Sequence, residues 1–169
     1  MNSQRCYVGV DNGVSGTIGI ITPEYTFFCE TPVYRDLDFH KTRPKYLNRL
    51  DFKKFRMILT AVYLDPLNTL VLLERPFSNA TRYIASTNAL RCWEATLIIL
   101  EQLGLKRDYA DSKGWQGMLL PKGIKGPDAQ KEASRQVGLR LFPEHTKLIN
   151  KHKDADGLLI AEWAKRSNL

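Results

Sequence analysis

Four acidic side chains lie where apolar segments of the sequence begin or end. Asp11 ends the segment YVGVD, Glu74 ends LVLLE, and Asp154 and Asp156 open the segment DADGLLIAEW. Strand ends meet at one edge of a sheet, so carboxylates placed there can converge. Convergent carboxylates favour Mg²⁺, a hard cation that prefers oxygen ligands. The same positions also fit simpler roles, Asp11 as a hairpin turn residue and Asp154 as a helix N-cap.

The elements that must position these acids follow from the apolar pattern. Strands joined by tight turns are expected at 5–10, 16–22 and 25–31, and the apolar run 69–74 is typical of a central strand covered on both faces. Helices are expected at 51–64, 86–103, 128–141 and 154–167, a fifth strand at 107–110, and polar loops at 33–50 and 114–127. This order predicts an α/β fold, a mixed sheet with helices packed on its faces.

The closing helix is expected to present its acid on a defined face. Leu159, Ile160 and Trp163 follow Asp156 at the spacing of one helical stripe. If that stripe packs on the sheet, Asp156 points to the edge where the strand-end carboxylates lie. Asp154 then lies outside the regular helix, because residues two apart cannot share one helix face.

Composition narrows the class of protein. The 169 residues suit one domain, residues 1–169, and 25 Lys and Arg against 18 Asp and Glu give a net charge of +7. Eight of these basic residues, interleaved with aromatic ones, lie between residues 33 and 56. This pattern suits a nucleic acid, although a solvated surface explains it equally well. The three scattered cysteines, the lack of a signal-peptide pattern and the lack of a membrane-length apolar segment predict a cytoplasmic protein without a membrane partner.

Four segments in order resemble the RuvC-like Holliday junction resolvases, including phage-type members. GVDNGVSGTIGII resembles their first strand and hairpin, and LVLLERPFSN the central strand that ends in a catalytic Glu. DAQKEASRQVGLRLFP resembles a basic helix, and KHKDADGLLIAEWAKR the closing helix. The resemblance implies an RNase H-like fold, with a mixed five-stranded sheet of three antiparallel strands followed by parallel ones, flanked by helices.

The resemblance also implies roles for individual residues. Asp11, Glu74 and Asp156 match the three core metal-binding, catalytic carboxylates, but Lys153 occupies the place of the fourth ligand. Asp154 is favoured as its substitute because a carboxylate is the harder ligand, and His152 remains the alternative ligand or a group behind the ligands. The expected DNA-binding residues are an aromatic that enters the junction and basic residues on or before the basic helix: Phe77, Lys122, Lys125, Lys131 and Arg135.

The function that the resemblance implies is resolution of four-way DNA junctions in the cytoplasm of a bacterial or phage-infected cell. Two Mg²⁺ ions per site, with Mn²⁺ able to substitute, would support paired nicks that leave 5′-phosphate and 3′-hydroxyl ends. Paired nicks call for a homodimer, with the apolar helix 89–103 as the candidate interface. Two alternatives are a non-catalytic branched-DNA-binding protein and an actin-like or sugar-kinase-like ATPase. The ATPase is disfavoured because the chain is too short for two lobes.

Overall fold

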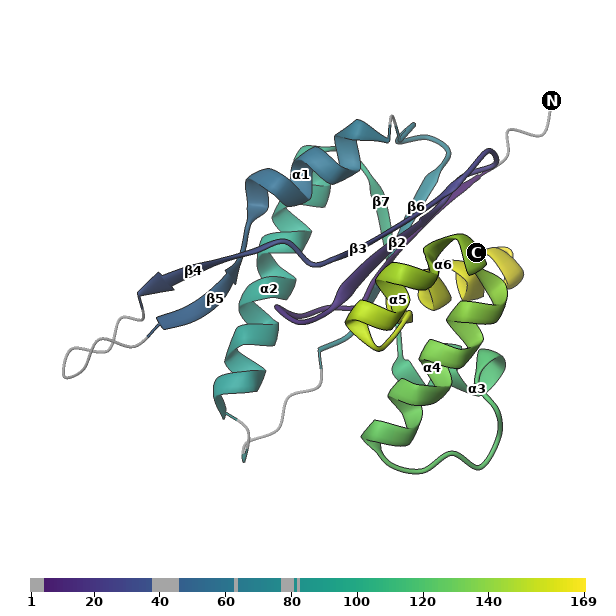
Figure 1. Ribbon diagram of the computed structural model, residues 1–169. Coiled ribbons are helices and arrows are strands. Elements are labelled where there is room, and N and C mark those ends of the chain that lie inside the picture. The colour runs from purple at the N-terminus through teal and green to yellow at the C-terminus, as the bar shows by residue number, and fades with distance from the viewer. Residues whose placement is uncertain (1–4, 38–45, 63, 77–80, 82) are drawn as a thin grey trace.

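The computed structural model describes residues 5–37, 46–62, 64–76, 81 and 83–169. A five-stranded sheet with the order β3-β2-β1-β6-β7 forms its centre. Strands β1 (Cys6–Val10), β2 (Thr17–Ile21) and β3 (Thr26–Glu30) pair antiparallel, while β6 (Thr69–Glu74) and β7 (Lys106–Ala110) continue parallel to β1. The predicted mixed sheet is confirmed (Figure 1).

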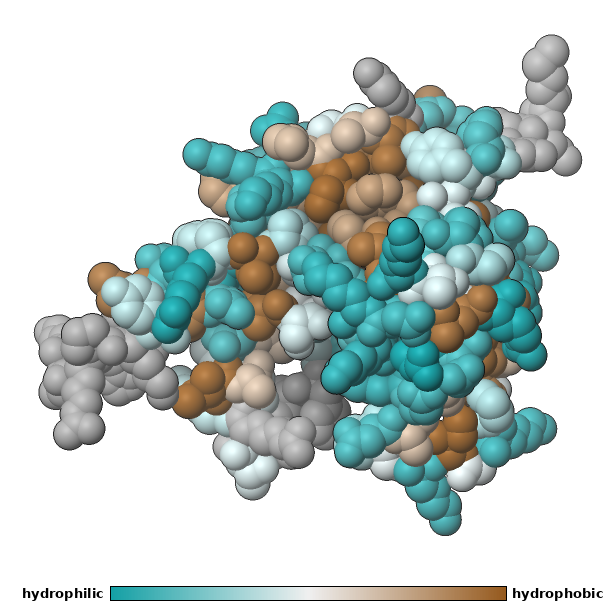
Figure 2. Space-filling view, in the orientation of Figure 1, coloured by the Kyte–Doolittle hydropathy of each residue, from teal (hydrophilic) through white to brown (hydrophobic). Residues whose placement is uncertain are grey.

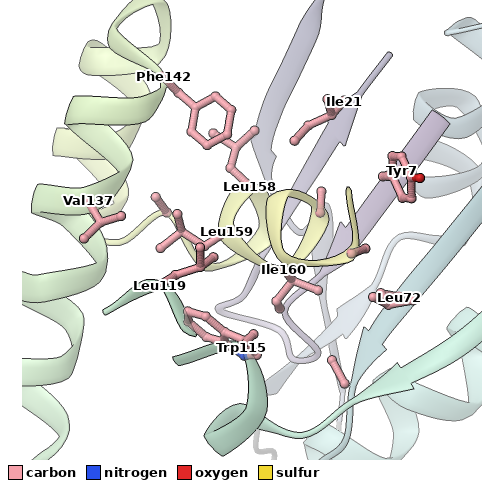
Figure 3. Packing of buried hydrophobic residues seen from close by; sticks show 14 of the residues in the cluster. Tyr7, Ile21, Leu72, Trp115, Leu119, Val137, Phe142, Leu158, Leu159 and Ile160 are labelled. Carbon is pink, nitrogen blue, oxygen red and sulfur yellow. The ribbon is translucent and has the colours of Figure 1, made fainter. Parts of the chain in front are cut away.

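Helices cover both faces of this sheet. Alternate residues of β6 point to opposite faces, so Leu70 and Leu72 join one core cluster while Val71 and Leu73 join the other. The first cluster is closed by α3 (Ser112–Leu119), α4 (Pro127–Leu141) and α6 (Asp156–Arg166), as Figure 3 shows, and the second by α1 (Phe52–Ala61) and α2 (Tyr83–Gln102). Within the described ranges, none of these helices is both long and apolar enough to cross a membrane.

Two glycines let α6 approach the sheet closely. A Cβ at Gly9 in β1 would overlap the carbonyl oxygen of Gly157, and one at Gly19 in β2 would overlap the backbone of Leu158. A side chain at either position would therefore push the start of α6 away from the strands. This contact brings the backbone around residue 157 against the two strands that flank Asp11.

The segment 33–50 is not the loop that the sequence predicts. Within it, β4 (Val33–Leu37) and β5 (Tyr46–Leu50) pair antiparallel as a separate two-stranded ribbon, which projects beside α2 in Figure 1. Most of its side chains are exposed, so the apolar alternation that identifies a half-buried strand is missing. Contacts between side chains of the two strands stabilise the ribbon in place of a buried face. For example, the Arg35 guanidinium lies 4.7 Å from the centre of the Tyr46 ring.

Two further expectations about the C-terminal half are wrong in detail. The predicted loop 114–127 begins inside α3, because burial of Trp115 and Leu119 outweighs the low helix propensity of the two glycines there. The sequence analysis also missed the short helix α5 (Thr146–His152), which follows the 3-10 turn Pro143–His145. Lys153 ends α5 in the left-handed conformation, with φ 63°, so α6 begins at Asp156 and not at residue 154.

Candidate metal centre

The strand order places Asp11 and Glu74 at the same edge of the sheet. Asp11 directly follows β1 and Glu74 is the last residue of β6, the parallel neighbour of β1. The backbone N–H of Asp11 donates to the carbonyl oxygen of Thr17 at 3.0 Å, which holds the turn into β2. The Glu74 carboxylate lies close enough to Asp11 for its charge to raise the pKa of Asp11.

Asp154 reaches this edge from the short connection between α5 and α6. Its side chain is almost completely buried, with 3% of the residue exposed. Thr17 fixes it, because the Thr17 hydroxyl donates to Asp154 Oδ1 at 3.4 Å and accepts from the backbone N–H of Gly157 at 3.0 Å. One side chain of β2 thus ties the start of α6 and the Asp154 carboxylate to the sheet.

Asp156 is the first residue of α6 and is held from the opposite side by α4. The Ser134 hydroxyl donates to Asp156 Oδ1 and accepts from the backbone N–H of Ala155 at 3.1 Å. Ser134 is itself buried. The orientation of the Asp156 carboxylate therefore depends on the packing of α4 against α6.

Together these elements form a compact acidic cluster, which consists of Asp11, Asp154 and Asp156 with Glu74 beside it. One carboxylate oxygen from each of the three aspartates lies within 4.8 Å of the others. Glu74 contacts this group through Asp11, and the indole N–H of Trp115 donates to Glu74 Oε1 at 3.1 Å. The cluster therefore draws carboxylates from β1, β6 and the start of α6.

The electrostatics of the cluster favour a bound cation. Burial, followed by the charges of Asp156 and Glu74, raises the pKa of Asp11 well above its usual value. Burial and the neighbouring Asp154 raise the pKa of Asp156 to about 7, and burial raises that of Asp154 against the opposing effect of Lys131. The Lys131 ammonium lies 4.0 Å from Asp154 Oδ2. Oxygen donors that repel one another in this way fit a hard divalent cation such as Mg²⁺.

Structures of Thermus thermophilus RuvC share this architecture. Thermus thermophilus RuvC in complex with a Holliday junction substrate aligns over 98% of this chain and 95% of its own, with a TM-score of 0.58 and 12% identity. The chain has the RuvC fold. A second Thermus thermophilus RuvC structure gives a TM-score of 0.50 with 11% identity over 96% of each chain. The fowlpox virus Holliday junction resolvase gives 0.45 with 14% identity over 96% of each chain.

Comparison by sequence and comparison by structure give different results for this chain. No protein-family model matches the sequence, and no curated protein matches it either. At 11–12% identity, the likeness to the RuvC structures shows the fold alone. Fold alone does not determine activity, which depends on the side chains at the site.

The structure distinguishes between Asp154 and His152, the two candidates for the fourth ligand. Asp154 joins the acidic cluster, whereas His152 lies on α5 and faces the end of β3. His152 Nδ1 is 3.5 Å from Glu30 Oε2, and its ring packs edge-on against Phe28 at 5.8 Å between centres. This geometry favours Asp154 as the ligand and leaves His152 with contacts to β3.

The residues expected to bind DNA have different surroundings. Lys122 and Lys125 are exposed between α3 and α4, and Lys131 is exposed on α4 beside the cluster. Arg135 is already engaged, since its guanidinium lies 2.7 Å from Glu132 Oε1 and donates to Asn150 Oδ1 at 2.6 Å. Phe77 lies outside the described residues.

Three residues of the site escaped the sequence analysis: Thr17, Ser134 and Trp115. None of them is acidic, and each contributes a hydrogen bond to a carboxylate. For Ser134 a signal existed, because its position falls on the same helical face as Ala133 and Val137, where a polar residue needs a buried partner. Thr17 and Trp115 carried no such signal, since β-branched and aromatic residues are ordinary core residues.

Proposed function

We propose that this protein is a metal-dependent endonuclease that cuts branched DNA, with four-way junctions as its preferred substrate. The observation that carries the proposal is the convergence of four carboxylates from three distant segments at one edge of a RuvC-like sheet. One of the structures with this fold is a RuvC protein in complex with a Holliday junction substrate. A protein that only binds DNA would lose affinity by placing buried carboxylates where phosphates approach.

Asp11, Asp154 and Asp156, with Glu74, would hold the metal. Mg²⁺ is the expected ion because the donors are all carboxylate oxygens, and Mn²⁺ could substitute. The family resemblance implies two ions per site. When bound, such ions lower the pKa of a water molecule and stabilise negative charge at a phosphate, which supports hydrolysis to 5′-phosphate and 3′-hydroxyl ends.

The residues behind the carboxylates keep them in place for this role. Thr17 and Ser134 each donate a hydroxyl to one carboxylate while accepting a backbone N–H, so both hydroxyls have fixed directions. The indole N–H of Trp115 donates to Glu74 Oε1 and orients that carboxylate. Lys131 places a positive charge 4.0 Å from Asp154 Oδ2, and its exposed side chain is positioned to attract a DNA phosphate to the cluster.

The surface around the cluster suits a polyanion. Figure 2 shows hydrophilic residues spread over α4 and α5. We expect simultaneous replacement of Lys122, Lys125 and Lys131 by Gln to weaken junction binding and to flatten its salt dependence by about one unit of log–log slope per lost phosphate contact. An unchanged slope, measured by fluorescence anisotropy at several salt concentrations, would mean that these lysines only solubilise the protein.

Resolution by paired nicks requires two active sites, and so a homodimer. In the helix proposed as the dimer interface, α2, only some of the apolar side chains are exposed and could contact a second copy of the chain. Leu100 is buried in the core, and Trp93 and Leu97 pack against the same core cluster, while Leu90 and Ile98 are about half exposed, at 48% and 49%. The interface hypothesis therefore rests on Leu90 and Ile98.

The test is a nuclease assay on end-labelled four-way junction, fork and linear duplex with Mg²⁺, resolved on denaturing gels. We expect paired nicks in the junction by the wild type. Asp11→Asn and Asp156→Asn should abolish cleavage and keep junction binding. Asp154→Asn should reduce cleavage severely with partial rescue by Mn²⁺, and His152→Ala should cost less. Wild-type rates for Asp11→Asn would refute the assignment, and binding without cleavage by the wild type would favour the non-catalytic alternative.

A further inference from the structure

A pocket of about 530 Å³ lies beside the acidic cluster and belongs to none of the expected site residues except His152. Its walls come from the β1–β2 turn, the end of β3, the start of β4, α1 and α5. The turn residue Gly16 connects it to the cluster, because a Cβ there would overlap the carbonyl oxygen of Asp11. The pocket and the carboxylates therefore share one turn of the chain.

The walls combine positive, negative and apolar groups. Lys54 on α1 and Lys151 on α5 both line the pocket with exposed side chains. Glu30 also lines it, with Lys151 Nζ 3.4 Å and His152 Nδ1 3.5 Å from its two carboxylate oxygens. Lys54 has a longer ion pair with Asp51, at 3.7 Å.

Apolar side chains complete the enclosure. Val14, Pro32, Val33 and Ile58 add aliphatic surface to the same walls. A volume of this size is ample for one small ligand, since such sites typically span ~300–1,000 Å³. This combination of aliphatic, basic and acidic groups suits a nucleotide. Its base would lie on the aliphatic surface, its phosphates would approach the lysines, and its base edge would face Glu30.

We propose that this pocket receives one unpaired nucleotide of the strand that is cut, next to the scissile phosphate. The inference rests on the proposed nuclease function and adds a reason for selectivity toward branched DNA. A base must leave its stack to enter the pocket, and the cost of unpairing is smallest where the base is already unpaired, as at a branch point. Since the Glu30 carboxylate only accepts hydrogen bonds, the pocket favours guanine, whose N1–H and N2 amino group both donate, over thymine, whose single N3–H donor lies between two carbonyl oxygens.

The first experiment scans the substrate. After the cut site has been mapped on a four-way junction, each nucleotide on either side is replaced in turn by an abasic tetrahydrofuran unit, which keeps the phosphate. Single-turnover cleavage by the wild type should fall roughly tenfold or more at one position beside the cut. Ile58→Trp, which fills the pocket, should cut the intact junction slowly and show no further loss with the abasic junction. Met57→Trp is the matched control, since Met57 is the preceding residue of α1 and is 66% exposed.

A second pair of variants keeps the test decisive if Ile58→Trp fails to fold. Glu30→Gln can both donate and accept, so it should reduce the discrimination against thymine at the sensitive position, while Glu24→Gln in the exposed β2–β3 turn should not. Active wild-type enzyme with no abasic-sensitive position, or unchanged discrimination in Glu30→Gln, overturns the pocket and leaves the nuclease function standing. Wild-type protein that cuts no branched DNA overturns both.

Discussion

Replacement of the Asp156 carboxyl group by an amide removes a charge that the fold holds at an energetic cost. Burial, and then Asp154, raise the pKa of Asp156 from 3.8 to about 7. Between these values the folded protein binds more protons than the unfolded chain, so its stability falls as the pH rises through the window. The penalty is absent below the window and complete above it.

The size of this effect follows from the width of the window. At about 1.4 kcal/mol per pH unit, roughly 3 units correspond to about 4 kcal/mol at pH 8. The new amide is buried and needs hydrogen-bond partners, which lowers the gain in the free energy of unfolding by about 1 kcal/mol. We expect Asp156→Asn to raise the free energy of unfolding by about 3 kcal/mol at pH 8 and by less than about 1 kcal/mol at pH 5. For a chain of this size, the difference in Tm should grow by roughly 5–10 °C between the two pH values.

The assay is thermal unfolding followed by circular dichroism in EDTA at pH 5, 6, 7 and 8. Asp108→Asn is the matched control, because Asp108 is exposed on β7 and is not part of the acidic cluster. Added Mg²⁺ should raise the Tm of the wild type, since a ligand of the folded state stabilises it, and should raise that of Asp156→Asn much less. If Asp156→Asn is less stable than the wild type at pH 8, or differs from it equally at pH 5 and pH 8, the electrostatic reasoning is wrong.

Three further predictions concern the groups that position the cluster. Gly9→Ala should lower the free energy of unfolding by about 1–3 kcal/mol and abolish cleavage because its Cβ displaces α6, while Gly117→Ala, whose Cβ meets nothing within 4 Å, should not destabilise α3. Lys153→Gly should raise stability by about 0.5–1 kcal/mol in denaturant unfolding, since glycine adopts φ 63° without strain. Trp115→Phe should weaken Mg²⁺ binding about tenfold or more in calorimetry by releasing Glu74, and an unchanged affinity would refute that role.

The sheet was predictable because its strands carry strong local signals. The run 69–74 is apolar throughout, and burial on both faces is what such a run requires. The acids at its end and at the end of β1 were predictable for the same reason, since a carboxylate that follows a buried strand needs a partner. The ribbon β4–β5 gave no such signal, because its cross-strand contacts replace a buried face.

The positioning of the cluster could not be predicted from local pattern. The close approach of α6 depends on glycines in two different strands, and only the tertiary structure shows that Gly9 and Gly19 face the same helix. The hydroxyls of Thr17 and Ser134 meet their carboxylates across sequence separations of 137 and 22 residues. Such contacts leave no period in the sequence, because each consists of one side chain from each partner.

The left-handed turn at Lys153 explains how Asp154 reaches the acidic cluster. In the left-handed conformation Lys153 ends α5 through its N–H, which donates to the Ile149 carbonyl at 2.8 Å, and its own side chain is exposed. The reversal of the chain then directs the next residue inward, and Asp154 meets the Thr17 hydroxyl before α6 begins. A ligand at 153 would need a different helix end. The position of the Asp154 carboxylate in the cluster therefore depends on the left-handed turn at Lys153.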